Sequence, residues 1–189
     1  MRLVLASASP RRLELLGRIG VIPDEVSATD IDETPHRAEQ PVAYARRMAA
    51  EKAAAAASGA GSLILAADTV VAAGRRILPK ADNAEQARAA LALLSGRRHR
   101  VHSAVTLIGG DGGARHRLST SIVAFKQLSE QELQAYLDSG EWLGKAGGYA
   151  IQGRAEALVR MLQGSHSGVM GLPLFETRAL LRSAGWPVG

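Results

Sequence analysis

The sequence predicts an α/β fold, in which apolar segments typical of strands alternate with helix-forming segments along one chain. Residues 3–6 and 62–67 are short, continuous apolar runs, as expected of strands that are covered on both faces. Residues 41–58 are rich in alanine and consist mainly of strong helix formers. A chain of 189 residues that is 47% apolar can bury one sizeable core. We therefore expect residues 1–189 to form a single domain.

The N-terminal segment predicts a strand, a tight polar turn and then a helix. Ser9 suits the helix N-cap, and Pro10 suits the first helical position, where its missing N–H would be unpaired anyway. The start of a helix has free backbone N–H groups. The hydroxyl of Ser7 and the guanidinium groups of Arg11 and Arg12 lie close to this start in the sequence. Together they favour a phosphate-binding site. A capped helix with two solvated arginines is an alternative that this segment alone leaves equally open.

Carboxylates occur in two places that suit chemistry. Residues 24–33 hold five of them in a predicted loop or short strand, and one or two could bind a divalent cation whose other ligands are phosphates. Asp68 follows the apolar run 62–67, and we expect it where that strand ends. Ligands gather at the carboxyl ends of strands in open α/β sheets, so Asp68 is a candidate for chemistry. The alternative is an aspartate that merely forms a turn.

The other elements are predicted from helix caps, glycine turns and periodicity. Helices are expected at residues 41–58, 82–94, 129–140 and 173–181, a hairpin at 70–78, and strands at 100–108, 118–125, 147–152 and 157–162. In the first of these helices Val42, Ala45, Ala49 and Ala53 can form the inner face. Lys52 is expected at the surface unless other residues indicate a ligand contact.

Composition excludes several classes of protein and site. There is no cysteine, which excludes disulfides and thiolate chemistry and fits a reducing compartment. No apolar run approaches the roughly 20 residues of a membrane span, and a secretory signal pattern is missing, so we expect a cytoplasmic protein without a membrane partner. The formal net charge of +5 suits anionic ligands. Nucleic acid is the less favoured of these, because the few aromatic residues are too scattered to stack bases.

Five segments resemble the Maf proteins, in the same order and over nearly the whole chain. They are Ser7–Arg12 (SASPRR), residues 51–53 (EKA), residues 67–71 (ADTVV), residues 144–147 (GKAG) with 151–153 (IQG), and residues 171–174 (GLPL). Two positions depart from the family. Lys80 is preceded by Pro79 and followed by Ala81, whereas the family has lysine followed by proline, and Gly168 stands where the family tends to have asparagine.

The resemblance implies a bilobed α/β structure around a long mixed sheet flanked by helices, with a nucleotide cleft between the lobes, as in Maf and inosine triphosphatase-like proteins. It also implies a nucleoside triphosphate pyrophosphatase that depends on a divalent cation, Mg²⁺ or Mn²⁺. Water would attack the α-phosphorus of dTTP, UTP or a modified pyrimidine nucleotide, giving the monophosphate and pyrophosphate. A homodimer and an influence on septum formation in cell division are both compatible with the resemblance.

The same resemblance assigns roles to individual residues. Asp68 is the general base, and Glu33 is the second acid, which holds the cation together with Asp68. The phosphates are neutralised by Lys52, Lys80 and Arg12, and Ser7 adds a donor. Specificity for dTTP and UTP is set by Arg11, Thr69 and Gln152. The amide of Gln152 can donate and accept together, which suits the edge of uracil or thymine. Three alternatives stay open: a pyrophosphatase for 7-methyl-GTP, a basic regulator that binds nucleic acid, and a nucleotide sensor without turnover.

Overall fold

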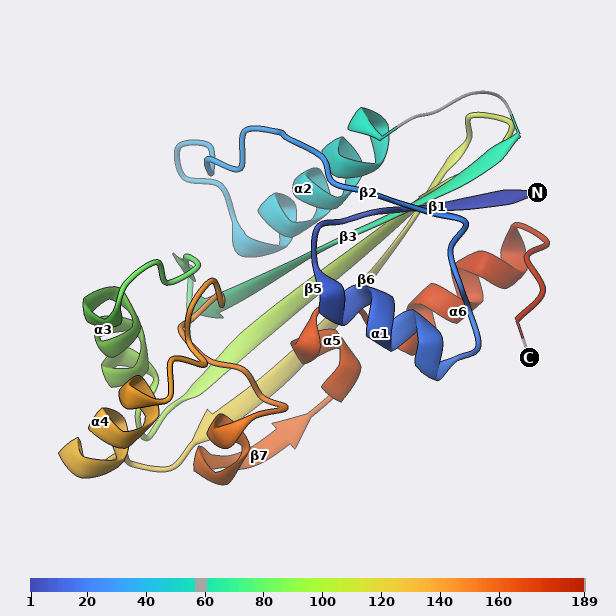
Figure 1. Cartoon of the computed structure of the whole chain (residues 1–189). Helices are drawn as coiled ribbons and strands as arrows, with labels where there is room; N and C mark the ends of the chain where they lie inside the picture. The colour runs from blue at the N-terminus through green and yellow to red at the C-terminus, as the bar shows by residue number, and fades with distance from the viewer. Residues whose placement is uncertain (57–60, 189) are drawn as a thin grey trace.

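A single mixed sheet of seven strands is the centre of the computed structural model, which describes residues 1–56 and 61–188 (Figure 1). The strands are β1 (Arg2–Ala6), β2 (Glu25–Ser27), β3 (Ser62–Ala73), β4 (Arg76–Leu78), β5 (Arg98–Ile108), β6 (Ala114–Phe125) and β7 (Val159–Gln163). Their order is β2-β1-β3-β5-β6-β7, and β4 pairs with β3. β1 runs parallel to β2 and β3, and the other pairs are antiparallel. The predicted α/β fold around a long mixed sheet is confirmed.

Helices cover both faces of the sheet (Figure 1). They are α1 (Pro10–Arg18), α2 (Pro41–Ala55), α3 (Ala84–Leu94), α4 (Glu130–Asp138), α5 (His166–Met170) and α6 (Leu174–Ser183), with a 3₁₀ turn, η1 (Arg154–Leu158). α2 packs on one face, where Ala49 meets Val70 of β3. The larger core lies on the other face and includes residues of α1, α3, α4 and α6. Because successive strand residues point to opposite faces, Asp68 faces the α2 side and Thr69 faces the larger core.

The edge of β3 that pairs with β1 is interrupted where Asp68 lies. Ala6, the last residue of β1, pairs with Ala66, and the next described partner on that edge is β4, whose last residue, Leu78, lies opposite Val71. On the other edge β5 pairs with β3 without a break. The prediction that Asp68 lies at the end of its strand is therefore wrong. β3 has 12 residues and continues past Asp68 through its pairing with β5, whereas the neighbouring β1 does end there.

Two further predictions about elements need correction or restriction. Residues 147–152 form no strand in the structure: Gly147 and Gly148 have φ of +69° and +72°, in the left-handed region. A Cβ at Gly147 would lie 2.7 Å from Cγ1 of Val71, so the segment packs closely against β3. α2 ends at Ala55, and the last two residues of the predicted helix, 57 and 58, lie outside the described residues.

The other predicted helices and strands are confirmed within a few residues at their ends. Among the described helices, none combines the length and the apolar character that a membrane span requires.

Candidate active site

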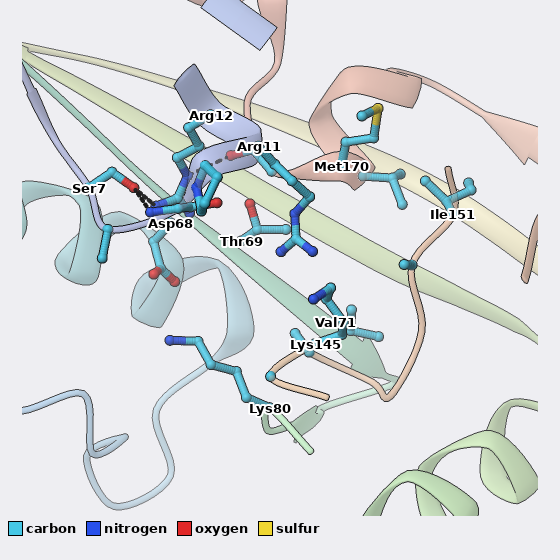
Figure 2. A pocket seen from close by; sticks show the side chains of 18 of the residues that line it. Ser7, Arg11, Arg12, Asp68, Thr69, Val71, Lys80, Lys145, Ile151 and Met170 are labelled. Atoms are coloured by element: carbon cyan, nitrogen blue, oxygen red, sulfur yellow. Dashed lines mark hydrogen bonds between the residues drawn. The ribbon is translucent and has the colours of Figure 1, made fainter. Parts of the chain in front are cut away.

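A cavity of about 530 Å³ lies at the interruption in the edge of β3 (Figure 2). Four segments form most of its walls: the turn between β1 and α1, the middle of β3, residues 143–152, and residues 169–171. All nine predicted site residues line it, namely Ser7, Arg11, Arg12, Glu33, Lys52, Asp68, Thr69, Lys80 and Gln152. The structure thus brings together residues that are up to 145 positions apart in the sequence, while their chemical roles stay predictions.

Lys52 lies between two carboxylates at the α2 side of the cavity. Its Nζ is 2.6 Å from Oδ1 of Asp68 and 2.7 Å from Oε1 of Glu33. Lys52 is only 6% exposed and Asp68 only 7%, so the expectation of a surface lysine is wrong. The side chain is buried because α2 directs it at the sheet, and the two carboxylates compensate its charge.

Glu33 is held in place through both its backbone carbonyl and its side-chain carboxylate. Tyr44 of α2 donates a hydrogen bond to its carbonyl oxygen at 2.7 Å, and Lys80 contacts its Oε2 at 2.8 Å. Burial acts to raise the pKa of Glu33, but the hydrogen bonds and charges of Lys52 and Lys80 outweigh burial and lower this pKa to about 2. Glu33 is therefore ionised at neutral pH.

Lys80 reaches the cavity although its neighbours depart from the family pattern. The backbone N–H of Gly147 donates to the carbonyl of Pro79 at 3.1 Å, and that of Ala81 donates to Lys145 at 3.1 Å. Lys80 also forms an isolated bridge with Ala146. These bonds attach the segment around Lys80 to the wall formed by residues 143–152, which keeps the lysine at the cavity.

The carboxylates fit a divalent cation only as part of a complex with phosphate. Glu33 and Asp68 both contact the ammonium of Lys52, so their oxygens converge on one point. No group of three or more His, Asp or Glu side chains that could hold a metal occurs within residues 1–56 and 61–188. Two carboxylates suffice for Mg²⁺ when substrate phosphates and water supply its other ligands. Because the Lys52 ammonium occupies this point, a divalent cation would have to bind beside it, to carboxylate oxygens that still have free lone pairs.

The start of α1 lines the cavity and has no side-chain cap. The predicted N-cap position of Ser9 is confirmed, although its side chain accepts no hydrogen bond from any described backbone N–H of the helix. Ser7 takes part instead: its Oγ accepts from the N–H of Ser9 at 3.1 Å and from Nη1 of Arg12 at 3.0 Å. An uncapped helix start in a cavity is a favourable place for phosphate oxygens.

Arg11 and Arg12 differ in how they are held. Nε of Arg12 donates to the carbonyl of Gly171 at 3.0 Å, which joins α1 to the segment that follows α5. Burial lowers the pKa of Arg12, and the nearby charge of Asp68 opposes that shift. Figure 2 shows the guanidinium of Arg11 pointing into the cavity. Its Nε is buried and has no hydrogen-bond partner among the described residues.

The cavity carries an excess of positive charge. Its five cationic side chains are Arg11, Arg12, Lys52, Lys80 and Lys145, and its two carboxylates are Glu33 and Asp68. Burial lowers the pKa of Arg11, and burial together with the charge of Arg11 lowers the pKa of Lys145. Concentrated positive charge with few counter-ions suits a polyanionic ligand. Lys145 was not among the predicted site residues, although it lies within the GKAG segment that carries the resemblance.

The wall opposite the carboxylates is mixed apolar and polar. Val71, Ile151 and Met170 give it an apolar surface, as Figure 2 shows. Thr69 lies beside them, and Gln152 is exposed at the rim. Such a wall suits a planar heterocycle that needs a few directed hydrogen bonds.

Comparisons with known proteins agree with this geometry. A family model described as Maf-like protein matches residues 2–184. A protein of Zymomonas mobilis named dTTP/UTP pyrophosphatase is 61% identical over 187 residues, which cover 98% of this chain and 93% of that protein. A protein of the same name from Novosphingobium aromaticivorans is 63% identical, over 98% of this chain and 93% of that protein. Another from Nitrobacter hamburgensis is 52% identical, over 100% of this chain and 94% of that protein.

A solved structure from Mycobacterium abscessus, described as nucleoside-triphosphatase / dITP/XTP pyrophosphatase, is 17% identical, with a TM-score of 0.46 and coverage of 98% of this chain and 95% of that one. At this distance it adds nothing to the assignment. The assignment rests on the family model and on relatives that are more than half identical along almost the whole chain. The segments that carry the resemblance also supply most of the cavity wall, and the chain belongs to the Maf family.

Proposed function

We propose that this protein hydrolyses dTTP and UTP to the nucleoside monophosphate and pyrophosphate. The observation that carries the proposal is that five cationic side chains, two converging carboxylates and an uncapped helix start meet in one cavity. A triphosphate needs that combination, because its hydrolysis depends on positioning and on neutralising charge on phosphate oxygens. The relatives named dTTP/UTP pyrophosphatase support the choice of substrate.

The triphosphate is bound by the helix start and the cations around it. Ser7 and the N–H groups of α1 donate to phosphate oxygens, and Arg12 adds a guanidinium that is already oriented by Gly171. Lys80 is more than half exposed, so its ammonium is free to move from Glu33 to a phosphate. These groups are fixed or near at hand before the substrate arrives, which reduces the cost of organising the site.

Asp68 acts as the general base that takes a proton from the attacking water. Lys52 bonds to Oδ1 of Asp68, which leaves Oδ2 as the oxygen that receives the proton. Glu33 and Asp68 would hold a divalent cation together with the phosphates, and a bound Mg²⁺ or Mn²⁺ would supply further neutralisation of phosphate charge. Lys52 keeps both carboxylates oriented toward the same point.

The nucleobase lies against the wall opposite the carboxylates. Val71, Ile151 and Met170 contact its faces and edges, and Arg11, Thr69 and Gln152 read its polar groups. Because Asp68 and Thr69 are consecutive residues of β3, their side chains lie on opposite faces of the sheet. A nucleotide that crosses the open edge of β3 therefore meets the general base, Asp68, and the specificity residue, Thr69, at consecutive positions of one strand.

A panel of triphosphates tests the proposal. Pyrophosphate release is measured from dTTP, UTP, CTP and 7-methyl-GTP, each with Mg²⁺, with Mn²⁺ and with a chelator. We expect cation-dependent release from dTTP and UTP, with the corresponding monophosphate as the other product. Preference for 7-methyl-GTP would contradict the roles of Arg11, Thr69 and Gln152. Tight binding without product from any triphosphate would favour a sensor without turnover.

The point of attack is tested separately with water labelled with ¹⁸O. Attack at the α-phosphorus puts the label into the monophosphate, whereas attack at the β-phosphorus puts it into pyrophosphate. Mass spectrometry of the two products distinguishes these results. Label in pyrophosphate would contradict the proposed geometry even if the substrates are correct.

The Asp68→Asn variant tests the base. We expect kcat to fall about 10² to 10⁴-fold, the usual contribution of a general base. The fold should persist, because the amide oxygen of asparagine can still accept the hydrogen bond from Lys52. Circular dichroism and thermal unfolding check the fold, and Asp111→Asn, in the exposed turn between β5 and β6, is the matched control. Near-full activity of Asp68→Asn would exclude Asp68 as the base.

A further inference from the structure

Ser103 lies directly behind Thr69, on the neighbouring strand β5. The two residues are paired in register, and their hydroxyl oxygens are 2.9 Å apart. Ser103 is only 1% exposed and does not line the cavity itself. Its influence on a ligand can therefore pass only through the group that it contacts, and Thr69 is the contact that faces the cavity.

The second partner of Ser103 fixes the direction of the hydrogen bonds. Oγ of Ser103 donates to the carbonyl oxygen of Gly168 in α5 at 2.5 Å. A carbonyl oxygen can only accept, and a serine hydroxyl has a single hydrogen. That hydrogen is used on Gly168, so Ser103 must accept from Thr69. The hydroxyl of Thr69 consequently donates its own hydrogen to Ser103, and only its lone pairs face the cavity.

Gly168 is held firmly enough to act as this anchor. Its N–H donates to Oγ of Ser165, the N-cap of α5, at 2.9 Å, and its carbonyl also accepts from the N–H of Gly171 at 3.1 Å. A Cβ at Gly168 would lie 3.1 Å from Cβ of Ser165, which shows how closely the turn packs. The position where the Maf pattern tends to have asparagine is thus a capped helical turn whose carbonyl points at Ser103.

We propose that Ser103 is a positioning residue that makes Thr69 a pure hydrogen-bond acceptor toward the nucleobase. An acceptor opposite N3 of the base selects a pyrimidine that carries a hydrogen on this nitrogen. Uracil and thymine have one donor on their pairing edge, N3–H, whereas N3 of cytosine is a lone pair that would face the lone pairs of Thr69. The inference rests on the proposed function, since it takes the ligand to be a pyrimidine nucleoside triphosphate.

Removal of the Ser103 hydroxyl releases this constraint. In Ser103→Ala the hydroxyl of Thr69 loses its acceptor and can turn its hydrogen into the cavity, where it can donate to N3 of cytosine. The carbonyl of Gly168 accepts two hydrogen bonds, from Ser103 and from the N–H of Gly171, and the variant retains the second. We therefore expect a change in discrimination between bases rather than a general loss of structure.

The test compares kcat/KM for UTP and CTP in the full-length protein and its variants. We expect the UTP to CTP ratio to fall about three- to tenfold in Ser103→Ala, the range of one neutral hydrogen bond. Ser103→Thr, which restores a hydroxyl, should return most of the ratio. Ser119→Ala is the matched control, because Ser119 pairs with Ser103 on β6, is also buried, and is not part of this chain of hydrogen bonds.

A double-variant cycle separates positioning from general loosening. Thr69→Val removes the acceptor and should lower the ratio by itself, and adding Ser103→Ala should then change the ratio no further. A merely structural role of Ser103 would lower kcat/KM for UTP and CTP alike and would leave their ratio unchanged. An unchanged ratio in Ser103→Ala, or equal use of UTP and CTP by the unmodified protein, would overturn the inference and leave the hydrolysis standing.

Binding gives a readout that does not depend on turnover. Calorimetry with the non-hydrolysable α,β-imido analogues of UTP and CTP should show the same loss of selectivity in Ser103→Ala. Selective binding of the UTP analogue that is lost in Ser103→Ala, without hydrolysis of UTP, would overturn the proposed function and support the inference. Binding of neither analogue, together with no hydrolysis of UTP, would overturn both.

Discussion

Arg11 and Arg12 are neighbours in the sequence with different tasks in the structure. Arg12 donates to Ser7 and to the carbonyl of Gly171, which is 159 positions away. Nε of Arg11 is buried without a hydrogen-bond partner among the described residues, and burial lowers the pKa of its guanidinium. A buried hydrogen-bond donor without a partner costs stability unless a ligand pairs with it. Arg11 therefore suits ligand binding, whereas Arg12 also stabilises the fold.

Separate substitutions by methionine distinguish these two tasks. Arg12→Met should lower the free energy of unfolding by about 2 kcal/mol, because two hydrogen bonds from a charged group are lost. Arg11→Met should change it by less than about 0.5 kcal/mol. Both variants should lower kcat/KM for dTTP at least about tenfold, since each removes a cation from the cavity. Urea unfolding and steady-state kinetics measure the two effects, and equal losses of stability would contradict the distinction.

The environment of single side chains was the hardest feature to predict from the sequence. Its place after an apolar run made Asp68 a candidate and the resemblance to the Maf proteins made Lys52 one, but helical spacing gave no reason to bury a lysine. Lys52 is buried because α2 lies on the sheet face to which Asp68 points, and this depends on packing between elements that are distant in sequence. Ser103 was missed for the same reason: its contact with Thr69 follows from the register of β3 and β5, which join residues 34 positions apart.

At the scale of elements, the helix starts differ in how they are capped. Oγ of Ser129 accepts from the N–H of Glu132 at 3.2 Å, and Oε2 of Glu132 accepts from the N–H of Ser129 at 2.9 Å, which completes a capping box at α4. Ser9 occupies the same position at α1 and makes no such bond to the described helix backbone. The start of α4 is therefore capped by side chains within the chain, whereas the start of α1 has no side-chain cap and borders the cavity.

Alanine substitutions at the two caps should therefore differ in their effects. Ser129→Ala should lower the free energy of unfolding by about 1 kcal/mol, the usual cost of a lost cap. Ser9→Ala should lower it by less than about 0.5 kcal/mol, because no capping bond is lost. Chemical denaturation of the two variants beside the unmodified protein measures the difference. A cost at Ser9 as large as that at Ser129 would show that the Ser9 hydroxyl caps α1 in solution.

Local patterns predicted most elements and failed where strand pairing or close packing determines the backbone conformation. The helices predicted from capping patterns at residues 82–85 and 129–132 are present, although the N-cap of the first is Asn83 and not Asp82. Asp68 was expected at a strand end, because the apolar run stops there, but pairing with β5 extends the strand to Ala73. Residues 147–152 read as a strand because they contain Tyr149 and Ile151, yet the positive φ of Gly147 and Gly148 turns the segment against β3.

At the scale of the whole molecule, a buried aromatic cluster joins the sheet to the wall of the cavity. His99 of β5 bonds through Nε2 to the hydroxyl of Tyr149 at 2.8 Å, and the rings of His99, Phe125 and Tyr149 meet edge to face. His99 is 3% exposed, and its Nδ1 is buried without a partner among the described residues. Burial lowers the pKa of His99 to about 4. The folded protein therefore holds this imidazole neutral where an unfolded chain would bind a proton.

This cluster makes the stability of the fold depend on pH. Between the ordinary histidine pKa of 6.5 and the folded value of about 4, the unfolded chain binds one more proton at His99 than the folded one, so acidification favours unfolding. The contribution is fully present above pH 6.5 and is lost as the pH falls to about 4, by about 3 kcal/mol in total. His102 acts in the same direction, because burial and the charge of Arg100 lower its pKa as well.

The His99→Gln variant isolates the share of His99 in this dependence. Glutamine retains a polar group for Tyr149 but cannot titrate, so the free energy of unfolding should fall less steeply between pH 6.5 and 4, by up to about 1.4 kcal/mol per pH unit. Urea unfolding at intervals from pH 4 to 8 measures both slopes. Between pH 7 and 8 the slopes should coincide, since His99 is neutral in both states there, and this range is the internal control. Parallel curves over the whole range would mean that His99 has the same pKa in the folded and the unfolded protein, and that its burial against Phe125 and Tyr149 does not set the response of the fold to acid.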